Sequence, residues 1–453
     1  MELSALVTKF CEKSPISVMA RGLIENVLTA ERLDACFERA SDGQYTRQLL
    51  FSTVFQLMTL VTTKVFPSVN AAYQSHKEEM NASLTSVYNK LNGLNVGVSE
   101  VLVNDTSQDL KTVIDKMKGC ATPLLPGFRL KLLDGNCIEA TDRRLKVLRH
   151  TGAAALPGKL LVVYEPEYQM ATEIIALEDG HAQERSALDK LLPNVSRNDV
   201  YVMDRNFCTQ KFLDDIAELG AFYIVRQHGN MPYETLEPEK QVGRIETGTV
   251  HEQWITIKSE SDGTPRKVRR IRIHLKNETR DGDRDLFILT NLTKASADAR
   301  KIAALYRHRW KIETMFQQLE SYLESEVNSL GYPKAAIFGF AVSVVAYNIM
   351  ATIKAALRSS HGEEKIENEV SGYYIAGELA RTREGMELIL EPEEWKPFEL
   401  MSKIELAKQL QCLSKKVVLS KYKKHKRGPK KKSVREKTNK AQPHISTARL
   451  LNA

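Results

Sequence analysis

The chain has 453 residues, of which 42% are hydrophobic and 27% are charged, with a net charge of +8. This composition is ordinary for a soluble protein, and the length allows roughly two to four domains. Six cysteines are scattered along the chain without a Cys-x2-Cys pair, which argues against a zinc site or a disulfide framework.

The same cysteine pattern suits a reducing cytosol, and the N-terminal sequence MELSALVTKF lacks the basic start and apolar core of a signal peptide. One run, Ala335–Ile353, approaches the length of a membrane span. It stands alone and contains Ser343 and Asn348. We therefore expect a helix buried inside a large domain of a cytoplasmic protein, and no membrane partner.

The positive charge is concentrated near the C-terminus. Between Lys415 and Lys440 there are 13 lysines and arginines and one acid, Glu436, a local charge of +12 that leaves the rest of the chain at −4. A basic segment of this kind is suited to contact a polyanion. We expect residues 420–453 to be a basic tail, in which the segment KYKKHKRGPKKK is disordered until it binds something.

Residues 1–122 carry apolar residues at helical spacing and predict an all-helical N-terminal domain. The near balance of acidic and basic residues gives no electrostatic support for DNA binding here. A helical packing domain and a domain that recognises DNA ends both remain open. The expected helical segments are Pro15–Leu28, Ala30–Ala40, Thr46–Phe66, Val69–Leu91 and the shorter Ser107–Lys118.

After Pro126 the pattern changes to strands alternating with helices, in the order β-β-β-α-β-α-β. Two acids follow strands directly: Asp134 follows the first strand and Asp204 the fourth. Side chains at strand ends are rigidly held and reach the open edge of a sheet, where sites form. The expected elements are strands Phe128–Leu133, Lys159–Tyr164, Gln169–Leu177, Val200–Met203 and Ala221–Val225, with helices Ala182–Leu192 and Thr209–Leu219.

Residues 228–285 interrupt this pattern with two alternating stretches that read as antiparallel strands, Thr249–Lys258 and Lys267–Lys276. Arg270 and Arg272 fall on the face opposite the apolar one and are candidate DNA contacts. The chain then returns to the core sheet. Further helices are expected at Ala335–Arg358, Ile375–Leu390 and Leu400–Leu419, the last two falling mainly in a helical C-terminal region, residues 374–419.

The stretch Tyr306–Leu330 contains no glycine or proline and predicts one long helix. At about 100° per residue, its apolar stripe is Ile312, Phe316, Leu319 and Leu323. A neighbouring stripe presents Tyr306, Arg309, Glu313 and Glu320 together from one rigid element. An Arg–Glu surface pair would produce the same spacing.

Asp134, Asp204 and Glu313 place three carboxylates on separate rigid elements. Carboxylate oxygens are the ligands that Mg²⁺ and Mn²⁺ prefer. Two such ions, about 3.5–4 Å apart, activate an attacking oxygen and stabilise a leaving one, which is the chemistry needed to cut or join a phosphodiester. Each acid alone could be a turn or helix cap, so the combination carries the argument.

The motifs around these acids are LLDGN at Asp134, YVMDRNF at Asp204 and YRHRWKIE at Glu313. Together they resemble the bacterial insertion-sequence DDE transposases, in particular the family named after insertion sequence four. That family is marked by Tyr-x2-Arg-x3-Glu-x6-Lys, which Tyr306, Arg309 and Glu313 fit. The resemblance covers roughly residues 128–356.

The resemblance implies an α/β RNase H-like core with a mixed five-stranded sheet, formed by residues 126–227 and 286–373 and carrying residues 228–285 as a β-strand insertion. It implies cut-and-paste DNA transposition by strand cleavage and strand transfer. Asp134, Asp204 and Glu313 would be catalytic and would hold two Mg²⁺, for which Mn²⁺ can substitute, while Tyr306 and Arg309 would contact DNA phosphate.

The resemblance also bears on partners. Double-stranded DNA, both element ends and target, would be bound by a homodimer, with residues 374–419 as the candidate dimer interface. The protein would be bacterial, cytoplasmic and nucleoid-associated. In relatives a hairpin forms at the cleaved end, and a base beside it must leave the stack. Trp254 and Trp310 are candidates to receive that base, although each could instead be a packing residue.

The chain departs from the family pattern at Glu320, where the family has lysine. Either another cation takes over this role, with a basic residue of the β insertion expected, or this copy is impaired. Two alternatives therefore stay open: an RNase H-like nuclease that only hydrolyses DNA, and a transposase-derived DNA-binding protein without cleavage activity.

Overall fold

The structure is a computed structural model that describes residues 4–41, 43, 49–78, 80–139, 141–142, 144–151, 153–279, 282–425 and 444–452. Its N-terminal part is helical, as the apolar spacing predicted. The expected segment 69–91 is two helices, and the expected short segment 107–118 is the end of a much longer one. The helices are α1 (Ala5–Lys13), α2 (Pro15–Val27), α3 (Ala30–Ala40), α4 (Phe51–Thr62), α5 (Val69–Ser75), α6 (Leu84–Gly93) and α7 (Val96–Met117).

A mixed sheet follows, with strand order β4-β3-β1-β5-β6. Strand β1 runs parallel to β5, and β5 runs parallel to β6, whereas β3 is antiparallel to both β1 and β4. The strands are β1 (Arg129–Ile138), β3 (Gly158–Glu165), β4 (Met170–Leu177), β5 (Asp199–Met203) and β6 (Phe222–Arg226), with a short β2 (Ala155–Leu156) apart from this sheet.

Short helical pieces connect these strands. Helix α9 (Gln210–Glu218) matches its prediction, but the expected helix at residues 182–192 is broken into several turns. These turns are η2 (Glu184–Ala187), α8 (Leu188–Leu191) and η3 (Leu192–Asn194); the remaining pieces are η1 (Lys146–Leu148) and η4 (Arg205–Phe207).

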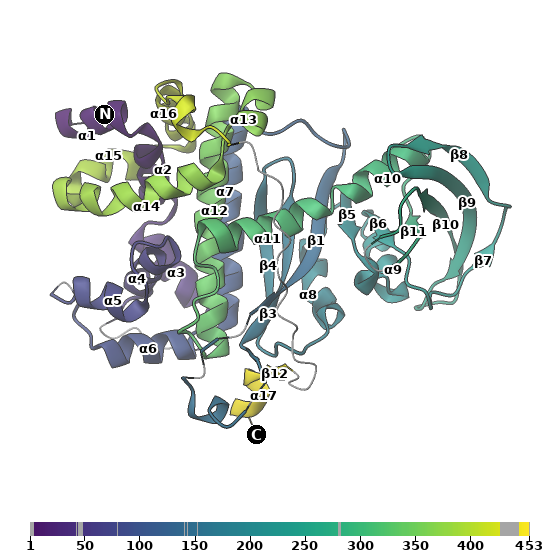
Figure 1. Ribbon diagram of the computed structural model, residues 1–453, viewed down its shortest axis with the longest axis horizontal. Coiled ribbons are helices and arrows are strands. Elements are labelled where there is room, and N and C mark those ends of the chain that lie inside the picture. Colours follow the sequence, from purple (N-terminus) through teal and green to yellow (C-terminus); the bar gives the residue numbers. More distant parts are fainter. Residues whose placement is uncertain are drawn as a thin grey trace.

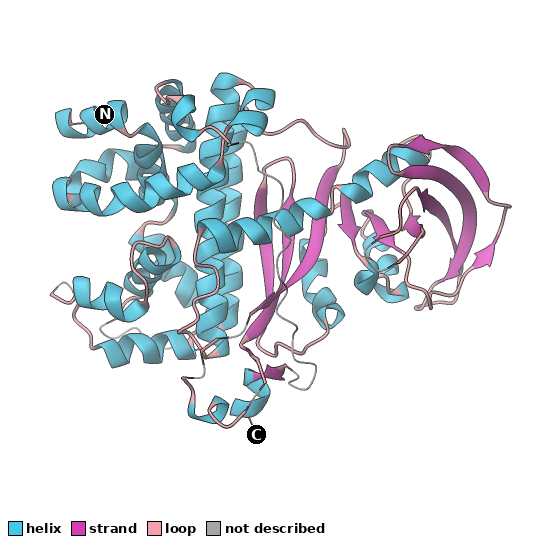
Figure 2. Cartoon of the chain, in the orientation of Figure 1, coloured by secondary structure: helices cyan, strands magenta, loops and turns pink. Residues whose placement is uncertain are grey.

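The β insertion is not a separate sheet. Strand β11 pairs antiparallel with β6 on one side and with β10 on the other, so the core sheet continues into the insertion. The continuous sheet has ten strands within the described ranges, twice the number expected for the core (Figure 2). The added strands are β7 (Glu234–Thr235), β8 (Lys240–Ile245), β9 (Gly248–Lys258), β10 (Pro265–Leu275) and β11 (Asp285–Thr290).

Helix α12 is the central packing element of the helical part. It runs beside α7 between the sheet and the other helices (Figure 1). It is long and apolar enough to cross a membrane, but 94% of its most apolar window is buried inside the protein, as the sequence predicted for 335–353. The helices of this part are α10 (Ala299–Arg307), α11 (Trp310–Tyr322), α12 (Pro333–His361), α13 (Glu363–Glu369), α14 (Gly372–Ile389), η5 (Pro392–Trp395), α15 (Lys396–Glu399), α16 (Lys403–Lys415) and η6 (Leu419–Tyr422).

The polar residues inside α12 bind the sheet. The side-chain amide of Asn348 donates to the carbonyl of Ala171 at 2.6 Å and accepts from the Ala171 amide at 3.0 Å. Asn348 is fully buried, and Ala171 lies beside the irregular register of β3 and β4. This pair satisfies two backbone groups of β4, which is an edge strand of the sheet.

Apolar side chains form two cores, one on each face of the sheet. Successive residues of β1, such as Leu132 and Leu133, belong to opposite cores, as the two-residue period of a strand requires. The larger core includes α7, α12, the N-terminal helices and helices α14 to α16. The N- and C-terminal helical regions therefore share one core.

The C-terminal residues are also packed. Strand β12 (Ile445–Ser446) pairs in parallel with β2, and Ser446 and Thr447 are fully buried at the start of α17 (Thr447–Leu451). Arg449 forms an ion pair with Asp179 at 2.9 Å. The expectation of a basic tail running to the end of the chain is therefore wrong for residues 444–452. Most of the basic segment, residues 426–443, lies outside the described residues.

Candidate active site

Asp134 and Asp204 lie side by side because their strands are neighbours. Strands β1 and β5 run parallel, and their pairing ends at Leu133 and Met203, so each aspartate is the next residue along its chain. Strand β5 stops there, but β1 continues to Ile138 by pairing with β3. The expectation that Asp134 follows its strand was wrong; it lies within β1, at the point where the parallel partner ends.

Local backbone contacts hold both carboxylates. The Asp204 side chain accepts from the Asn206 amide at 2.7 Å and caps the turn η4. Asp134 accepts from the amide of Gly135 at 2.9 Å. A Cβ atom at Gly135 would lie 2.3 Å from the Glu184 carboxylate, so a larger residue here would force Glu184 to move.

The helix that carries Glu313 is shorter than predicted. The expected helix 306–330 is divided at His308–Arg309 into α10 and α11, and it ends at Tyr322. At the division the amides of His308 and Arg309 bond to carbonyls three residues back, at 3.0 and 3.1 Å, which forms a tight turn. Helix α11 ends where the Glu324 amide donates to Thr62 of the N-terminal region at 2.8 Å.

This turn lets one guanidinium reach two of the predicted acids. Arg309 Nη1 lies 2.7 Å from Asp134 Oδ2, and Arg309 Nη2 lies 2.7 Å from Glu313 Oε1. The surface Arg–Glu pair considered from sequence is present, but Arg309 is only 13% exposed and extends to a second carboxylate. Tyr306 is buried in the preceding turn and also hydrogen bonds to Arg309.

The pKa values of the site residues are shifted because several acids lie close together in a partly buried site. Burial raises the pKa of Asp134 to about 7; Arg309 opposes this shift, while Asp204 and Glu313 add to it. Burial lowers the pKa of Arg309, but Asp134, Tyr306 and Glu313 outweigh burial and the net direction is upward. Burial also raises the pKa of Tyr306. These couplings place Asp134, Asp204, Glu313, Tyr306 and Arg309 in one site.

The two tryptophans differ in surroundings. Trp310 is 62% exposed, with the Arg309 guanidinium 5.4 Å from its ring centroid, so it is not a core residue. Trp254 in β9 is half-buried, and Lys267 Nζ lies 4.5 Å and Lys294 Nζ 6.0 Å from its ring centroid. Both rings therefore lie beside cations.

The basic face expected on β10 is largely paired within the protein. Arg270 stacks on Phe287, with its guanidinium carbon 3.9 Å from the ring centroid, and hydrogen bonds to two glutamines. Arg272 forms ion pairs with Glu239 at 2.6 Å and with Asp285 at 3.5 Å. A DNA phosphate would have to compete with these partners.

The cation nearest the end of α11 was missed from sequence. Lys64 Nζ lies 3.3 Å from the carbonyls of Glu320 and Ser321 and 3.9 Å from Glu324. A basic residue of the β insertion was expected in this role, whereas Lys64 follows α4 in the N-terminal region. Its left-handed backbone, with φ 61°, is rare for a lysine and is seen only in the structure, so the sequence offered no signal for this contact.

A fourth acid near β1 was also missed. Glu326, in the loop after α11, accepts from the Glu139 amide at 3.2 Å and from the Asn136 side chain. Burial, followed by the neighbouring Glu139 and Glu320, raises the pKa of Glu326 to about 7. Asn136 lies two residues after Asp134, on the same face of β1. Nothing in the spacing of Glu326 marked it in the sequence.

The donor set is suited to a divalent metal, although its arrangement is not that of a formed metal site. Within the described part of the chain, no three Asp, Glu, His or Cys side chains form a group that could hold an ion. The Arg309 guanidinium lies between two of the acids, which shows that they converge on a positive group. Oxygen ligands of this type suit Mg²⁺ or Mn²⁺.

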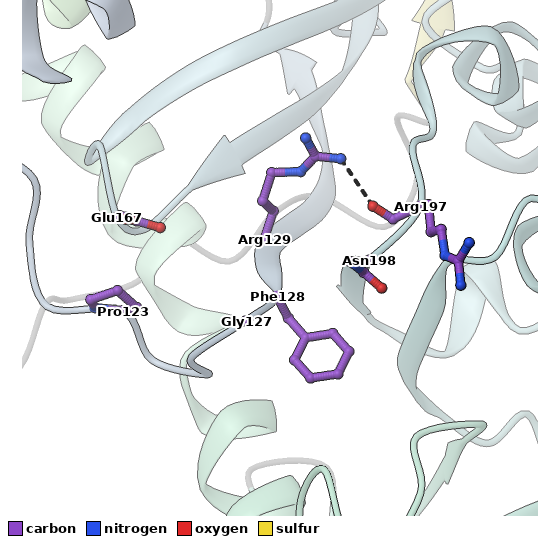
Figure 3. Close-up of a pocket in the computed structure, with 7 residues that line it drawn as sticks. All are labelled: Pro123, Gly127, Phe128, Arg129, Glu167, Arg197 and Asn198. Atoms are coloured by element: carbon purple, nitrogen blue, oxygen red, sulfur yellow. Dashed lines mark hydrogen bonds between the residues drawn. The ribbon is translucent and has the colours of Figure 1, made fainter.

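A surface hollow of about 330 Å³ lies near the other end of β1 and is separate from this site (Figure 3). Across it, Arg129 donates to the carbonyl of Arg197 at 3.2 Å. Its lining residues are Pro123, Gly127, Phe128, Arg129, Glu167, Arg197 and Asn198.

Comparison with known proteins shows that the part of the chain that contains this site is similar to transposases. The family model described as transposase DDE domain matches residues 130–349. A protein of Geobacillus stearothermophilus, named as the probable transposase for insertion sequence element IS5377, is 25% identical over 194 residues, covering 43% of this chain and 48% of the relative. A second, from Sinorhizobium fredii (strain NBRC 101917 / NGR234) and named "Putative transposase y4zB", is 27% identical over 169 residues, covering 37% of this chain and 45% of the relative.

The chain spans about half the length of these relatives. Among solved structures, a piggyBac transposase synaptic complex with hairpin DNA covers 86% of both chains at 10% identity and a TM-score of 0.38, a likeness too low to support an argument. The family match contains Asp134, Asp204 and Glu313, together with the β insertion between the last two. Residues 130–349 of this chain therefore match the transposase DDE domain, and both relatives are named as transposases.

Proposed function

We propose that the chain is a DNA transposase that moves an insertion sequence by cut-and-paste transposition. One observation carries the proposal: Arg309 bonds both Asp134 and Glu313, and Asp204 lies beside Asp134 on the neighbouring strand, inside the region that matches the transposase DDE domain. Activity on DNA, with strand cleavage followed by strand transfer, is the function that this arrangement supports best.

The catalytic fold is proposed to be RNase H-like. The order β4-β3-β1-β5-β6 supports this assignment, because three antiparallel neighbours are followed by two parallel additions on the other side of β1. The first strand is then central, and its aspartate lies beside the aspartate that follows its parallel neighbour. Residues 126–227 and 286–373 would form this core.

In this proposal Asp134, Asp204 and Glu313 hold two Mg²⁺ ions, with Mn²⁺ as a possible substitute. When bound, such ions lower the pKa of an attacking water and stabilise the leaving oxygen. The protein supplies rigid positions for the ligands: β1 and the turn after β5 hold the aspartates, and the first turn of α11 holds the glutamate. Tyr306 and Arg309 contribute a hydroxyl and a guanidinium suited to a phosphate.

Other DNA contacts follow from exposure and charge. Trp310, exposed beside the site, and Trp254, flanked by two lysines, each offer a ring on which a flipped base can stack. Arg270 and Arg272 are weaker candidates because they already have partners. The basic segment within residues 420–453 supplies sequence-independent phosphate contacts.

The helical regions are proposed to serve end recognition and dimerisation. Residues 1–122 are the candidate for recognising DNA ends. Residues 374–419 are the candidate interface of a homodimer, because two DNA ends must be cut and joined together. Among the described residues of this region, four large apolar side chains are at least half exposed: Ile389 at 56%, Leu400 at 59%, Ile404 at 50% and Val418 at 54%.

The test is strand transfer with pre-cleaved ends of the insertion sequence, a labelled target duplex and Mg²⁺. A transposase joins the 3′-OH ends to the target, whereas an enzyme that only hydrolyses leaves the target unjoined. A DNA-binding protein without activity neither cuts intact ends nor joins pre-cleaved ones. Joined products support the proposal, and their absence with correctly folded protein contradicts it.

A further inference from the structure

Each carboxylate of the candidate site already accepts hydrogen bonds from the protein. Arg309 donates to Asp134 and to Glu313, both at 2.7 Å. The Gly135 amide donates to Asp134 at 2.9 Å, and the Asn206 amide donates to Asp204 at 2.7 Å. Among the described residues, the guanidinium of Arg309 is thus the positive group that pairs with two of the three carboxylates.

A divalent metal and this arrangement of Arg309 exclude each other. A metal shared by Asp134 and Glu313 competes with the guanidinium, because Arg309 bonds Oδ2 of Asp134 and Oε1 of Glu313, the Gly135 amide bonds Oδ1 of Asp134, and the two positive charges repel. The Arg309 side chain is 13% exposed and that of Asp134 is 16% exposed, so water screens this repulsion poorly. Metal binding therefore requires the guanidinium to leave, and the guanidinium needs another anion as its partner.

Arg309 has such a route available. It lies in the tight turn between α10 and α11, and its guanidinium is 5.4 Å from the ring centroid of Trp310, which is 62% exposed. Rotation toward that ring brings the guanidinium to the surface beside the site. There it can bond bidentately to a backbone phosphate, for which its fork of donors is well suited.

We propose that Arg309 is a positioning residue that keeps the carboxylates closed to divalent metal until a DNA phosphate takes its guanidinium. The inference rests on the proposed function, since it makes DNA the anion that opens the site. Metal and DNA then bind with positive coupling, and by linkage each strengthens the other. Protein without DNA carries little metal and is protected from hydrolysing unintended phosphodiesters.

The test measures Mn²⁺ binding to the full-length protein without DNA, by the electron paramagnetic resonance signal of free Mn²⁺ at pH 8. Arg309→Gln removes the competing charge and should bind Mn²⁺ at least tenfold more tightly than the wild type. Arg309→Lys retains one charge and should lie between them. Arg307→Gln removes an exposed arginine, paired with Glu246 at 3.3 Å, and should leave the dissociation constant unchanged.

A second arm adds saturating duplex DNA. Because DNA itself binds Mn²⁺, binding is read as the difference between each protein and its Asp204→Asn counterpart under the same conditions. DNA should tighten Mn²⁺ binding by the wild type severalfold and change Arg309→Gln little.

Equal Mn²⁺ affinity of the wild type and folded Arg309→Gln overturns the inference, and so does wild-type affinity that DNA leaves unchanged. If Arg309→Gln does not fold, Arg309→Lys with wild-type Mn²⁺ affinity overturns it as well. The proposed function fails separately, by absence of strand transfer, and that result leaves the Mn²⁺ competition to be judged on its own.

Discussion

Arg269 connects the β insertion to the segment that leads into α10. Its side chain is fully buried, with Nε donating to Glu252 at 2.7 Å and Nη1 donating to the carbonyls of Leu292 and Ala297 at 2.9 and 2.8 Å. We predict that Arg269→Met, which removes all three bonds, lowers the free energy of unfolding by about 3 kcal/mol. Loss of one buried partner costs about 3–5 kcal/mol, and the lower end applies because Lys294 still pairs with Glu252 at 2.9 Å.

The measurement is urea unfolding followed by the fluorescence of Trp254, the cross-strand neighbour of Arg269, with the other two tryptophans replaced by phenylalanine. Arg284→Met is the matched control, because that arginine is 66% exposed and its ion pair contributes about 1 kcal/mol or less. Adding Glu252→Leu to Arg269→Met should recover part of the loss, since no buried charge then remains unpaired. A loss below about 1 kcal/mol for Arg269→Met would refute the reasoning.

Three further predictions follow from single residues. Asn348→Leu should lower the free energy of unfolding by about 2–3 kcal/mol, because two buried backbone groups of Ala171 lose their partners; unchanged urea unfolding would contradict this. In metal-free protein, the Asp134 carboxyl stays protonated when folded up to a pKa of about 7 but ionises near 3.8 when unfolded, so stability should fall as pH rises between these values. The melting temperature of Asp134→Asn should fall less than that of the wild type over the same pH range. Equal slopes of melting temperature against pH for the two proteins would count against a raised pKa. Glu320→Lys should keep the fold and strengthen binding to cleaved DNA ends, and the slope of log Kobs against log salt concentration should become steeper by about 0.9. Glu320→Gln should give part of the gain in binding. Loss of cleavage in both variants would instead make Glu320 a required acid.

Periodicity predicted the parts of this fold that depend on local pattern. The two-residue period located most strands of the sheet, and the apolar run Val200–Met203 correctly placed Asp204 at the end of β5. The long apolar run was correctly predicted as the buried helix α12. The three acids and Arg309 could be found because each lies within a short motif with characteristic neighbours.

Features set by contacts between distant segments could not be predicted in this way. Helix α11 ends at Tyr322 because the following backbone bonds to Thr62, and no residue near 322 signals an end. The break before Trp310 likewise lacks glycine or proline. Arg269 falls on the apolar face of β10 beside Ile271, and only the packed structure supplies its partners, Glu252 and two carbonyls.

The continuity of the sheet also lay beyond sequence reasoning. The sequence predicts that β11 returns to the core sheet, and β11 does pair with β6. Its pairing with β10 on the opposite edge depends on the folded insertion and has no local signal in the sequence. The basic segment predicts a tail that runs to the end of the chain, whereas Ser446 pairs with β2 and both Ser446 and Thr447 are fully buried.

The central claim is that Asp134, Asp204 and Glu313 together form the catalytic site. The direct measurement is cleavage of the insertion-sequence ends in Mg²⁺ by Asp134→Ala, Asp204→Ala and Glu313→Ala, with melting temperature and binding to DNA ends measured on the same preparations. We predict that each variant loses cleavage, remains folded and still binds DNA. Cleavage at the wild-type rate by any one of the three would contradict the assignment.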